Sequence, residues 1–176
     1  GPVVRLTPPA GGLRPLSLVI PGDPSSAAFL IVAALITPGS DIVLRGVCLN
    51  PTRTGLIEVL HRMGGQIDVL ATCEQGGEPV GDLRVRYSAL RGVQVSGSVV
   101  VRMIDEFPIF AIAAVYADGE TWVGDAEELR YKESDRINAL CQELAALGAQ
   151  IEPLPDGFVI RGRRPLCGGH THARGD

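Results

Sequence analysis

The sequence has no long apolar run, no excess of basic residues and no closely spaced cysteine pair, and each absence excludes a class of protein. No run reaches the length of a transmembrane helix, and residues 1–5 lack the basic start of a signal peptide. The formal net charge of −4 gives no reason to expect nucleic acid or a membrane surface as a partner. We therefore expect a globular protein with neither partner.

The cysteine pattern indicates free thiols. The four cysteines, at positions 48, 73, 141 and 167, contain no Cys-x-x-Cys spacing, which is typical of a chain in a reducing compartment. We predict a cytoplasmic location, with Cys141 in the core because it falls on the apolar face of a helix. His170 and His172 lie near Cys167, but no fourth ligand is evident. We therefore predict no metal and no cofactor.

Capping residues followed by proline mark two predicted helix starts. Asp23-Pro24 and Asn50-Pro51 each combine a side chain that caps helices with a proline suited to the first helical turn. A third helix, amphipathic, is predicted to end at Gly148, and the start of this helix is discussed below.

Apolar runs predict the remaining elements. Runs 27–36 and 107–116 are apolar on every side, which predicts two helices buried all round. Short runs between glycine and proline clusters predict strands. These strands are expected at 16–20, 41–47, 66–70, 83–87, 99–104, 120–123, 150–151 and 158–160.

The amino-acid sequence contains an internal repeat. Met-Gly-Gly-Gln-Ile-Asp at 63–68 is matched by Leu-Gly-Ala-Gln-Ile-Glu at 147–152. Each copy reads β-α-β-α-β-β, so we predict an α/β fold of the α+β type, with buried helices and surrounding sheets. The predicted divisions are a connector at 1–17, a first unit at 18–97, a second unit at 98–165 and the start of a third unit at 166–176.

The two copies place different residues at equivalent helix starts. Ser25-Ser26 in the first copy corresponds to Asp105-Glu106 in the second. Helix N-termini attract anions, so the hydroxyl pair suits either a cap or a phosphate. The carboxylate pair suits either a cap or proton transfer, and Asp105 capping the following helix is the simpler interpretation.

Charges of both signs are packed into 129–136, with the letters Leu-Arg-Tyr-Lys-Glu-Ser-Asp-Arg, before the amphipathic helix. One interpretation is a solvated helix start capped by Ser134. The other is a polar cluster in a cleft. Lys132 and Arg136 would then grip anionic groups, and Glu133 would transfer protons.

Three stretches together resemble the EPSP synthase family. They are Pro-Gly-Asp-Pro-Ser-Ser-Ala at 21–27, Met-Ile-Asp-Glu-Phe-Pro at 103–108, and Glu-Leu-Arg-Tyr-Lys-Glu-Ser-Asp-Arg-Ile at 128–137. The final Gly-Asp is where that family continues into an Asp-His-Arg motif. The resemblance covers essentially the whole chain. It implies a fold of two lobes, each built from three β-α-β-α-β-β units, of which this chain would hold about two of the six.

The resemblance also implies partners and roles. The family joins phosphoenolpyruvate to shikimate 3-phosphate and releases phosphate. Asp105 would contact the 5-hydroxyl of the shikimate substrate and take its proton, and Lys132 would bind the same substrate. Glu133 would exchange the proton at the methylene carbon of phosphoenolpyruvate, and Arg136 would pair with the carboxylate of that molecule. These four are the predicted site residues.

The resemblance assigns other contacts of the family's active site to segments outside this chain. We therefore expect an internal part of the enzyme that is inactive alone, and an unclosed lobe that can self-associate. Two alternatives stay open: an enzyme like UDP-N-acetylglucosamine enolpyruvyl transferase, and a non-catalytic scaffold of the same fold.

Overall fold

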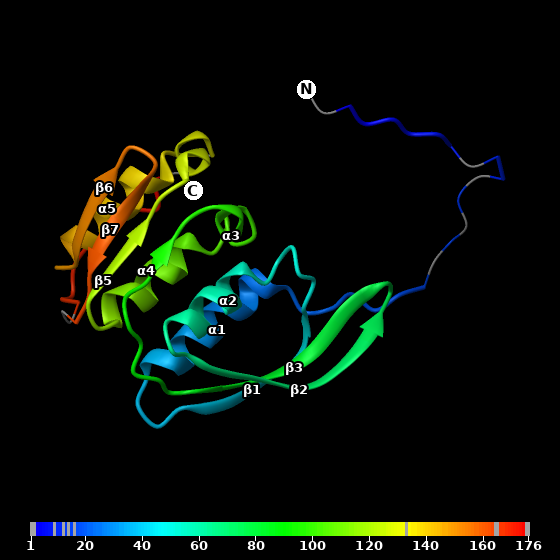
Figure 1. Ribbon diagram of the computed structural model, residues 1–176, viewed down its shortest axis with the longest axis horizontal. Helices are drawn as coiled ribbons and strands as arrows, with labels where there is room; N and C mark the ends of the chain where they lie inside the picture. Colours follow the sequence, from blue (N-terminus) through cyan, green and yellow to red (C-terminus); the bar gives the residue numbers. More distant parts are fainter. Residues whose placement is uncertain are drawn as a thin grey trace.

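The computed structural model in Figure 1 describes residues 3–8, 10–11, 13, 15, 17–132, 134–163 and 166–174. The helices in this part are α1 (Pro24–Ile36), α2 (Gly55–Arg62), α3 (Ser98–Val101), α4 (Phe107–Tyr116), the 3-10 helix η1 (Glu127–Tyr131) and α5 (Arg136–Ala146). The strands are β1 (Asp41–Cys48), β2 (Gln66–Gln75), β3 (Glu78–Arg86), β4 (Gln94–Val95), β5 (Glu120–Val123), β6 (Gln150–Leu154) and β7 (Gly157–Arg161).

The strands form two sheets with the same internal order. The first runs β1-β3-β2 and the second β4-β5-β7-β6, so in both the last strand along the chain lies between its two antiparallel partners. The second sheet adds β4 parallel to β5, and Gly22 makes one parallel bridge to Val47 at the equivalent edge of β1. The expected α/β fold of repeated strands and helices is confirmed.

The boundaries of the two units stay a prediction. β4 lies inside the range 18–97 assigned to the first unit, yet it pairs with β5, so the second sheet begins before residue 98. The described residues from 166 onward form no helix or strand and run along α5, where the Cys167 amide donates to the Leu147 carbonyl at 2.7 Å.

Helix α1 begins as the sequence predicts. The carboxylate of Asp23 accepts from the Ser26 amide at 2.9 Å, and Pro24 occupies the first turn, where its missing N–H costs nothing. The prediction of burial on every side is wrong, because Phe29 is 61% exposed and Leu30 55%. In α4, Tyr116 is 47% exposed. The two helices pack against each other and their sheets on part of their circumference, and no described element covers the rest.

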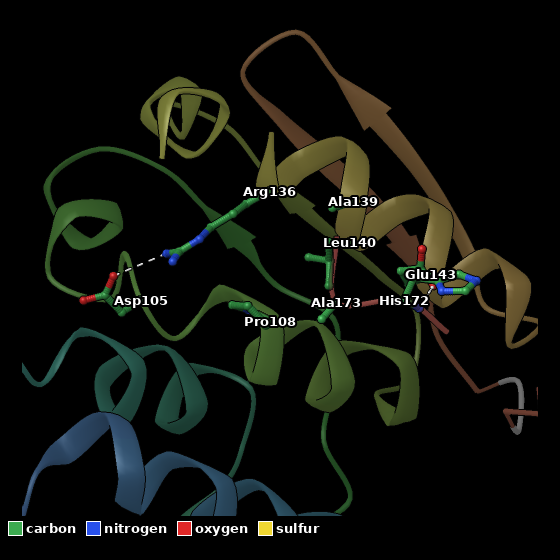
Figure 2. A pocket seen from close by; sticks show the side chains of 8 residues that line it. All are labelled: Asp105, Pro108, Arg136, Ala139, Leu140, Glu143, His172 and Ala173. Carbon is green, nitrogen blue, oxygen red and sulfur yellow. Dashed lines mark hydrogen bonds and ion pairs between the residues drawn. The ribbon is translucent and has the colours of Figure 1, made fainter. Parts of the chain in front are cut away.

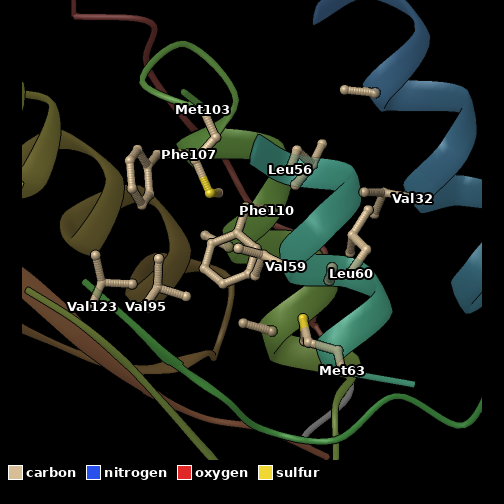
Figure 3. Packing of buried hydrophobic residues seen from close by; sticks show 14 of the residues in the cluster. Val32, Leu56, Val59, Leu60, Met63, Val95, Met103, Phe107, Phe110 and Val123 are labelled. Carbon is tan, nitrogen blue, oxygen red and sulfur yellow. The ribbon is translucent and has the colours of Figure 1, made fainter. Parts of the chain in front are cut away.

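One core joins the two sheets through the helices between them (Figure 1). In Figure 3, Leu60 of α2 and Met63, which follows that helix, lie on one side of Phe110 of α4, and Val95 and Val123 of the second sheet lie on the other side. The ring of Phe107 meets Phe110 and Phe158 edge-on, with centroids 6.1 Å apart in both pairs. Such edge-to-face pairs add about 0.5–1.5 kcal/mol beyond the area they bury.

Equivalent glycines end equivalent helices. Gly64 after α2 has φ 91° and Gly148 after α5 has φ 90°, in the left-handed region where a Cβ is strained. In both places the next residue, Gly65 or Ala149, donates its amide back to a carbonyl of the helix. The repeated motif therefore encodes a helix stop followed by a strand.

Three element predictions are wrong. Within 16–20 the described residues form no strand, and Ile20 is 82% exposed, because none of these residues pairs with a described strand. Asn50-Pro51 starts a turn, in which the Asn50 side chain accepts from the Thr52 amide at 2.9 Å, and α2 begins only at Gly55. The run 99–104 is helix α3 followed by turns, although its β-branched residues favour a strand.

Two other features bear on the expectations from the sequence. Cys141 is 5% exposed, which confirms its place in the core, and burial raises the pKa of its thiol to about 11. Within the described ranges, no helix is both long and apolar enough to cross a membrane.

Candidate active site

Three helix starts meet at one end of the molecule. Ser25 in the first turn of α1 donates a hydrogen bond from its hydroxyl to Glu106, the residue before α4. Arg136, the first residue of α5, pairs with Asp105 through Nη1 and Oδ1 at 3.4 Å. Each helix start carries backbone N–H groups without helical partners and a partial positive charge. Their convergence makes this region suited to anionic groups.

Figure 2 shows Asp105 and Arg136 pointing toward each other. Both residues line an open cavity of about 370 Å³. The Asp105 side chain lies in the turn before α4 and is 57% exposed, whereas the Arg136 side chain is 18% exposed. Pro108 and Leu140 give the cavity apolar walls, and His172 closes its far side. The contact between Arg136 and Asp105 is a single long hydrogen bond rather than a bidentate pair.

Two charged residues of the segment 129–136, Arg130 and Asp135, anchor it to its neighbours. Arg130 donates to the carbonyls of Leu154 and Pro155 at 2.6 and 2.7 Å, and to Asp135 at 2.8 Å. Asp135 caps α5 by accepting from the Asn138 amide at 3.0 Å. The predicted Ser134 cap is therefore wrong. These contacts tie the segment to the β6–β7 turn and fix where α5 begins.

The structure brings together two of the four predicted site residues. Asp105 and Arg136 pair directly. Lys132 is half-buried at the end of η1 and, among the described residues, is not one that lines the cavity. Glu133 lies outside the described residues. Glu106 rather than Asp105 occupies the cap position of α4, so the interpretation of Asp105 as the cap is wrong.

Glu106 is a residue of this region that the sequence did not single out. Its side chain is 4% exposed, and burial raises its pKa, against the lowering effect of the Ser25 hydroxyl and Arg53. Arg53 donates to the Ser25 hydroxyl at 2.9 Å and pairs with Asp23 at 3.2 Å. The carboxylate pair at 105–106 was the available signal, but the sequence does not show which member turns inward.

The two serines of α1 have separate roles. Ser25 faces Glu106, while both the amide and the hydroxyl of Ser26 donate to Asp23 at 2.9 Å. Partial burial opposes the shift, but these two hydrogen bonds, together with the Ser25 amide and the charge of Arg53, lower the pKa of Asp23. Ser26 therefore belongs to the cap of α1 itself.

The segment after β7 forms the far wall of the cavity. Glu143 on α5 accepts from Arg174 Nε at 2.6 Å and from the His172 amide at 2.8 Å, and the Arg174 guanidinium is the main cause that lowers the pKa of Glu143. A second hollow of about 420 Å³ lies behind this segment and is lined by apolar side chains of three helices, among them Phe29, Ile112 and Leu144. Among the described residues, no three metal-binding side chains lie close enough to hold an ion.

Comparison with known proteins gives a consistent result. The family model of EPSP synthase (3-phosphoshikimate 1-carboxyvinyltransferase) matches residues 3–176. A 3-phosphoshikimate 1-carboxyvinyltransferase of Desulforudis audaxviator is 59% identical over 89% of this chain and 37% of its own length. One from Roseiflexus sp. is 54% identical over 99% of this chain and 41% of its own length. The chain thus spans about two fifths of the relatives it matches.

Solved structures extend the comparison to the fold. EPSP synthase from Acinetobacter baumannii superposes with a TM-score of 0.84 at 43% identity, over 88% of this chain and 35% of that one. The enolpyruvyl transferase NikO from Streptomyces tendae reaches a TM-score of 0.56 at 18% identity, which is evidence of a shared fold alone. With nearly all of its residues matched by the family model, the chain belongs to the EPSP synthase family.

Proposed function

We propose that this chain takes part in the transfer of the enolpyruvyl group of phosphoenolpyruvate to the 5-hydroxyl of shikimate 3-phosphate, with release of phosphate. The observation that carries the proposal is the Asp105–Arg136 pair, which lines an open cavity at three converging helix starts. Both substrates are anions, and the helix starts and Arg136 supply positive potential where an anion would bind.

The reaction needs a base at the hydroxyl and an acid at carbon. As the hydroxyl oxygen attacks the substituted carbon of phosphoenolpyruvate, its proton leaves and another proton joins the methylene carbon. Loss of phosphate, with loss of a proton from the same carbon, then restores the double bond. The exposed Asp105 carboxylate suits the first task, and the family resemblance assigns the second to Glu133.

Cations would hold the substrates in place for this chemistry. A guanidinium pairs with a carboxylate through two parallel hydrogen bonds, so Arg136 suits the carboxylate of phosphoenolpyruvate. Its largely covered side chain gives it a fixed direction. Lys132, a compact charge on a flexible stem, suits the shikimate substrate, which the resemblance assigns to it. Neither the described cavity nor this reaction calls for a metal or cofactor.

The test is a titration of the isotope-labelled chain with shikimate 3-phosphate, with and without phosphoenolpyruvate, followed by NMR. We expect shifts at Asp105, Lys132 and Arg136. Arg136→Gln should abolish them, while Arg161→Gln, on the exposed surface of β7, should leave them in place. A folded chain that binds both ligands only at sites remote from 105 and 136 would contradict the proposal.

Isolated, the chain should show no turnover, because the resemblance assigns further anion contacts to segments outside it. Self-association is a second part of the proposal. The hollow lined by Phe29, Ile112 and Leu144 exposes apolar surface that a second copy would cover. Sedimentation of the wild type and of Phe29→Lys would separate a dimer from a monomer. The exposed free thiols of Cys73 and Cys167 suit the reducing cytoplasm.

A further inference from the structure

Glu106 is a buried carboxylate that does not serve its own helix. Among the residues that the structure describes, the buried polar side chains are Ser88, Thr121 and Glu106, and Glu106 alone of these carries an acid. It occupies the cap position of α4, where a side chain ordinarily bonds the first free amides, but it makes no such bond. Burying an ionisable group is costly, so the partner that it reaches instead is informative.

That partner belongs to the other half of the fold. The Glu106 carboxylate accepts from the hydroxyl of Ser25 in the first turn of α1, and the same hydroxyl accepts from Arg53 at 2.9 Å. Arg53 also pairs with Asp23. The hydrogen bonds run in one direction, from guanidinium to hydroxyl to carboxylate, and charge strengthens the two ends.

The bridge fixes the turn that carries Asp105. The amide of Glu106 donates to the Met103 carbonyl at 3.0 Å, and its carbonyl accepts from the Phe110 amide at 2.8 Å. Glu106 is therefore held by hydrogen bonds at its amide, at its carbonyl and, through Ser25, at its side chain. Asp105 is the residue immediately before Glu106, and its side chain points toward Arg136.

We propose that Glu106 is a positioning residue for Asp105, and that Ser25 is its anchor on α1. Through this bridge the position of the first helix sets the place of the Asp105 carboxylate opposite Arg136. The role in chemistry rests on the proposed function, whereas the effect on the Asp105–Arg136 pair exists without any substrate. The carboxylate is needed for its reach and its acceptor oxygen, so glutamine should replace it better than alanine.

The experiment compares four variants of this chain: Glu106→Ala, Glu106→Gln, Ser25→Ala and Ser26→Ala. Ser26→Ala is the matched control, because it removes a hydroxyl from the same helix turn without touching Glu106. The first readout, without ligand, is the carboxyl carbon shift of Asp105 and the side-chain nitrogen shift of Arg136. Glu106→Ala and Ser25→Ala should move both signals, Glu106→Gln should largely restore them, and Ser26→Ala should leave them unchanged.

The second readout is the dissociation constant for shikimate 3-phosphate. Glu106→Ala and Ser25→Ala should weaken binding about tenfold, the scale of one displaced hydrogen bond to a charged group. A purely structural role would lower the unfolding midpoint of both serine variants and leave the Asp105 and Arg136 signals in place, which would overturn the inference. If Glu106→Ala does not fold, the comparison of Ser25→Ala with Ser26→Ala decides between the two outcomes.

The two proposals fail in different ways. If the wild type ignores shikimate 3-phosphate while Ser25→Ala still moves the Asp105 signal, the positioning role stands and the proposed function falls. If the wild type binds the ligand and neither Ser25→Ala nor Glu106→Gln nor Glu106→Ala changes Asp105 or the affinity, the function stands and the positioning role falls.

Discussion

The two halves of the chain share an architecture but not a chemistry. In each, a buried helix leads to a strand, a second helix ends at a left-handed glycine, and the last strand enters the middle of the sheet. The second helix differs in how it begins. Before α2 the chain makes a plain turn at Asn50, whereas before α5 it runs through η1 and a dense set of charges. The packing residues are repeated because both halves need a core, while the charged segment before α5 has no counterpart before α2.

The first helices differ in the same sense. At the start of α1, Asp23 caps the helix and is bonded to Ser26. At the start of α4, Glu106 leaves its helix uncapped and reaches across to Ser25. One start is locally complete, and the other depends on its neighbour. The second copy of the repeat thus carries Asp105, and the first copy carries Ser25, which bonds the residue next to Asp105.

The largest expected difference between the two halves comes from truncating one pair of equivalent positions, one in α1 and one in α4. Leu30 of α1 and Phe110 of α4 correspond in the repeat, yet Leu30 is 55% exposed and Phe110 fully buried. Phe110→Ala should lower the free energy of unfolding by about 3–5 kcal/mol, through lost burial and a cavity. Leu30→Ala should change it by less than about 1 kcal/mol. Urea unfolding followed by circular dichroism measures both, and equal losses would contradict the difference in packing.

Substitutions at the two helix ends, Gly64 and Gly148, should have equal effects on stability, because the backbone conformation is the same in both halves there. Gly64→Ala and Gly148→Ala each place a Cβ at a φ near 90° without a close steric contact. Each should cost about 1–2 kcal/mol, since the strain is conformational and the same in both. The measurement is again urea unfolding. A loss confined to one variant would show that the two stops are not equivalent.

The two helix starts should respond to pH with opposite signs. The lowered pKa of Asp23 contributes stability that is present above its ordinary value of 3.8 and is lost as the pH falls through the lowered value. Burial raises the pKa of Glu106, so its contribution is fully present below its ordinary value of 4.5 and is lost as the pH rises through the raised value.

Thermal unfolding across pH 3 to 8 tests these signs. Asp23→Asn should flatten the acid side of the stability profile, and Glu106→Gln should remove the decline just above pH 4.5. A Glu106→Gln profile that declines as the wild type does would show that another group titrates there.

The smallest effects should come from the cross-strand ion pairs that both sheets carry. Arg86 pairs with Asp68 between β3 and β2, and Arg161 pairs with Glu152 between β7 and β6, each at 2.7 Å. All four side chains are at least 40% exposed, so water and salt screen them. Arg86→Gln and Arg161→Gln should each shift the unfolding midpoint less than the glycine variants do. A shift that persists at 1 M salt would point to a packing role for the arginine stem.

Elements with strong local signals were predictable from the sequence. Helix 107–116 and strand 120–123 match α4 and β5 because their apolar pattern and flanking glycines agree. Asn50-Pro51 misled because a capping side chain also closes a turn, and α2 begins where Gly55 bonds Arg102 and Leu56 is buried. Tertiary packing likewise overrode the strand preference of 99–104, since Val99, Val100 and Met103 are buried together in the core.

The candidate site was predictable in part. Asp105 and Arg136 were found from a family resemblance, and the structure brings them together. Glu106 was missed because its importance arises from a contact with Ser25, 81 positions away along the chain. Local pattern identifies residues that suit a chemistry, but it does not show which of two adjacent carboxylates turns toward another helix.

The position of the last strand in each sheet has a consequence for synthesis of the protein. β1 and β2 do not touch each other and meet only through β3, and β5 and β6 meet only through β7. At translation rates of about 5–20 residues per second, β1 therefore waits for a few seconds until its antiparallel partner β3 is made, and β5 waits likewise for β7. The apolar faces of α1 and α4 are exposed to other nascent chains during that interval, so a ribosome pause before residue 78 or residue 157 would prolong the period of greatest aggregation risk.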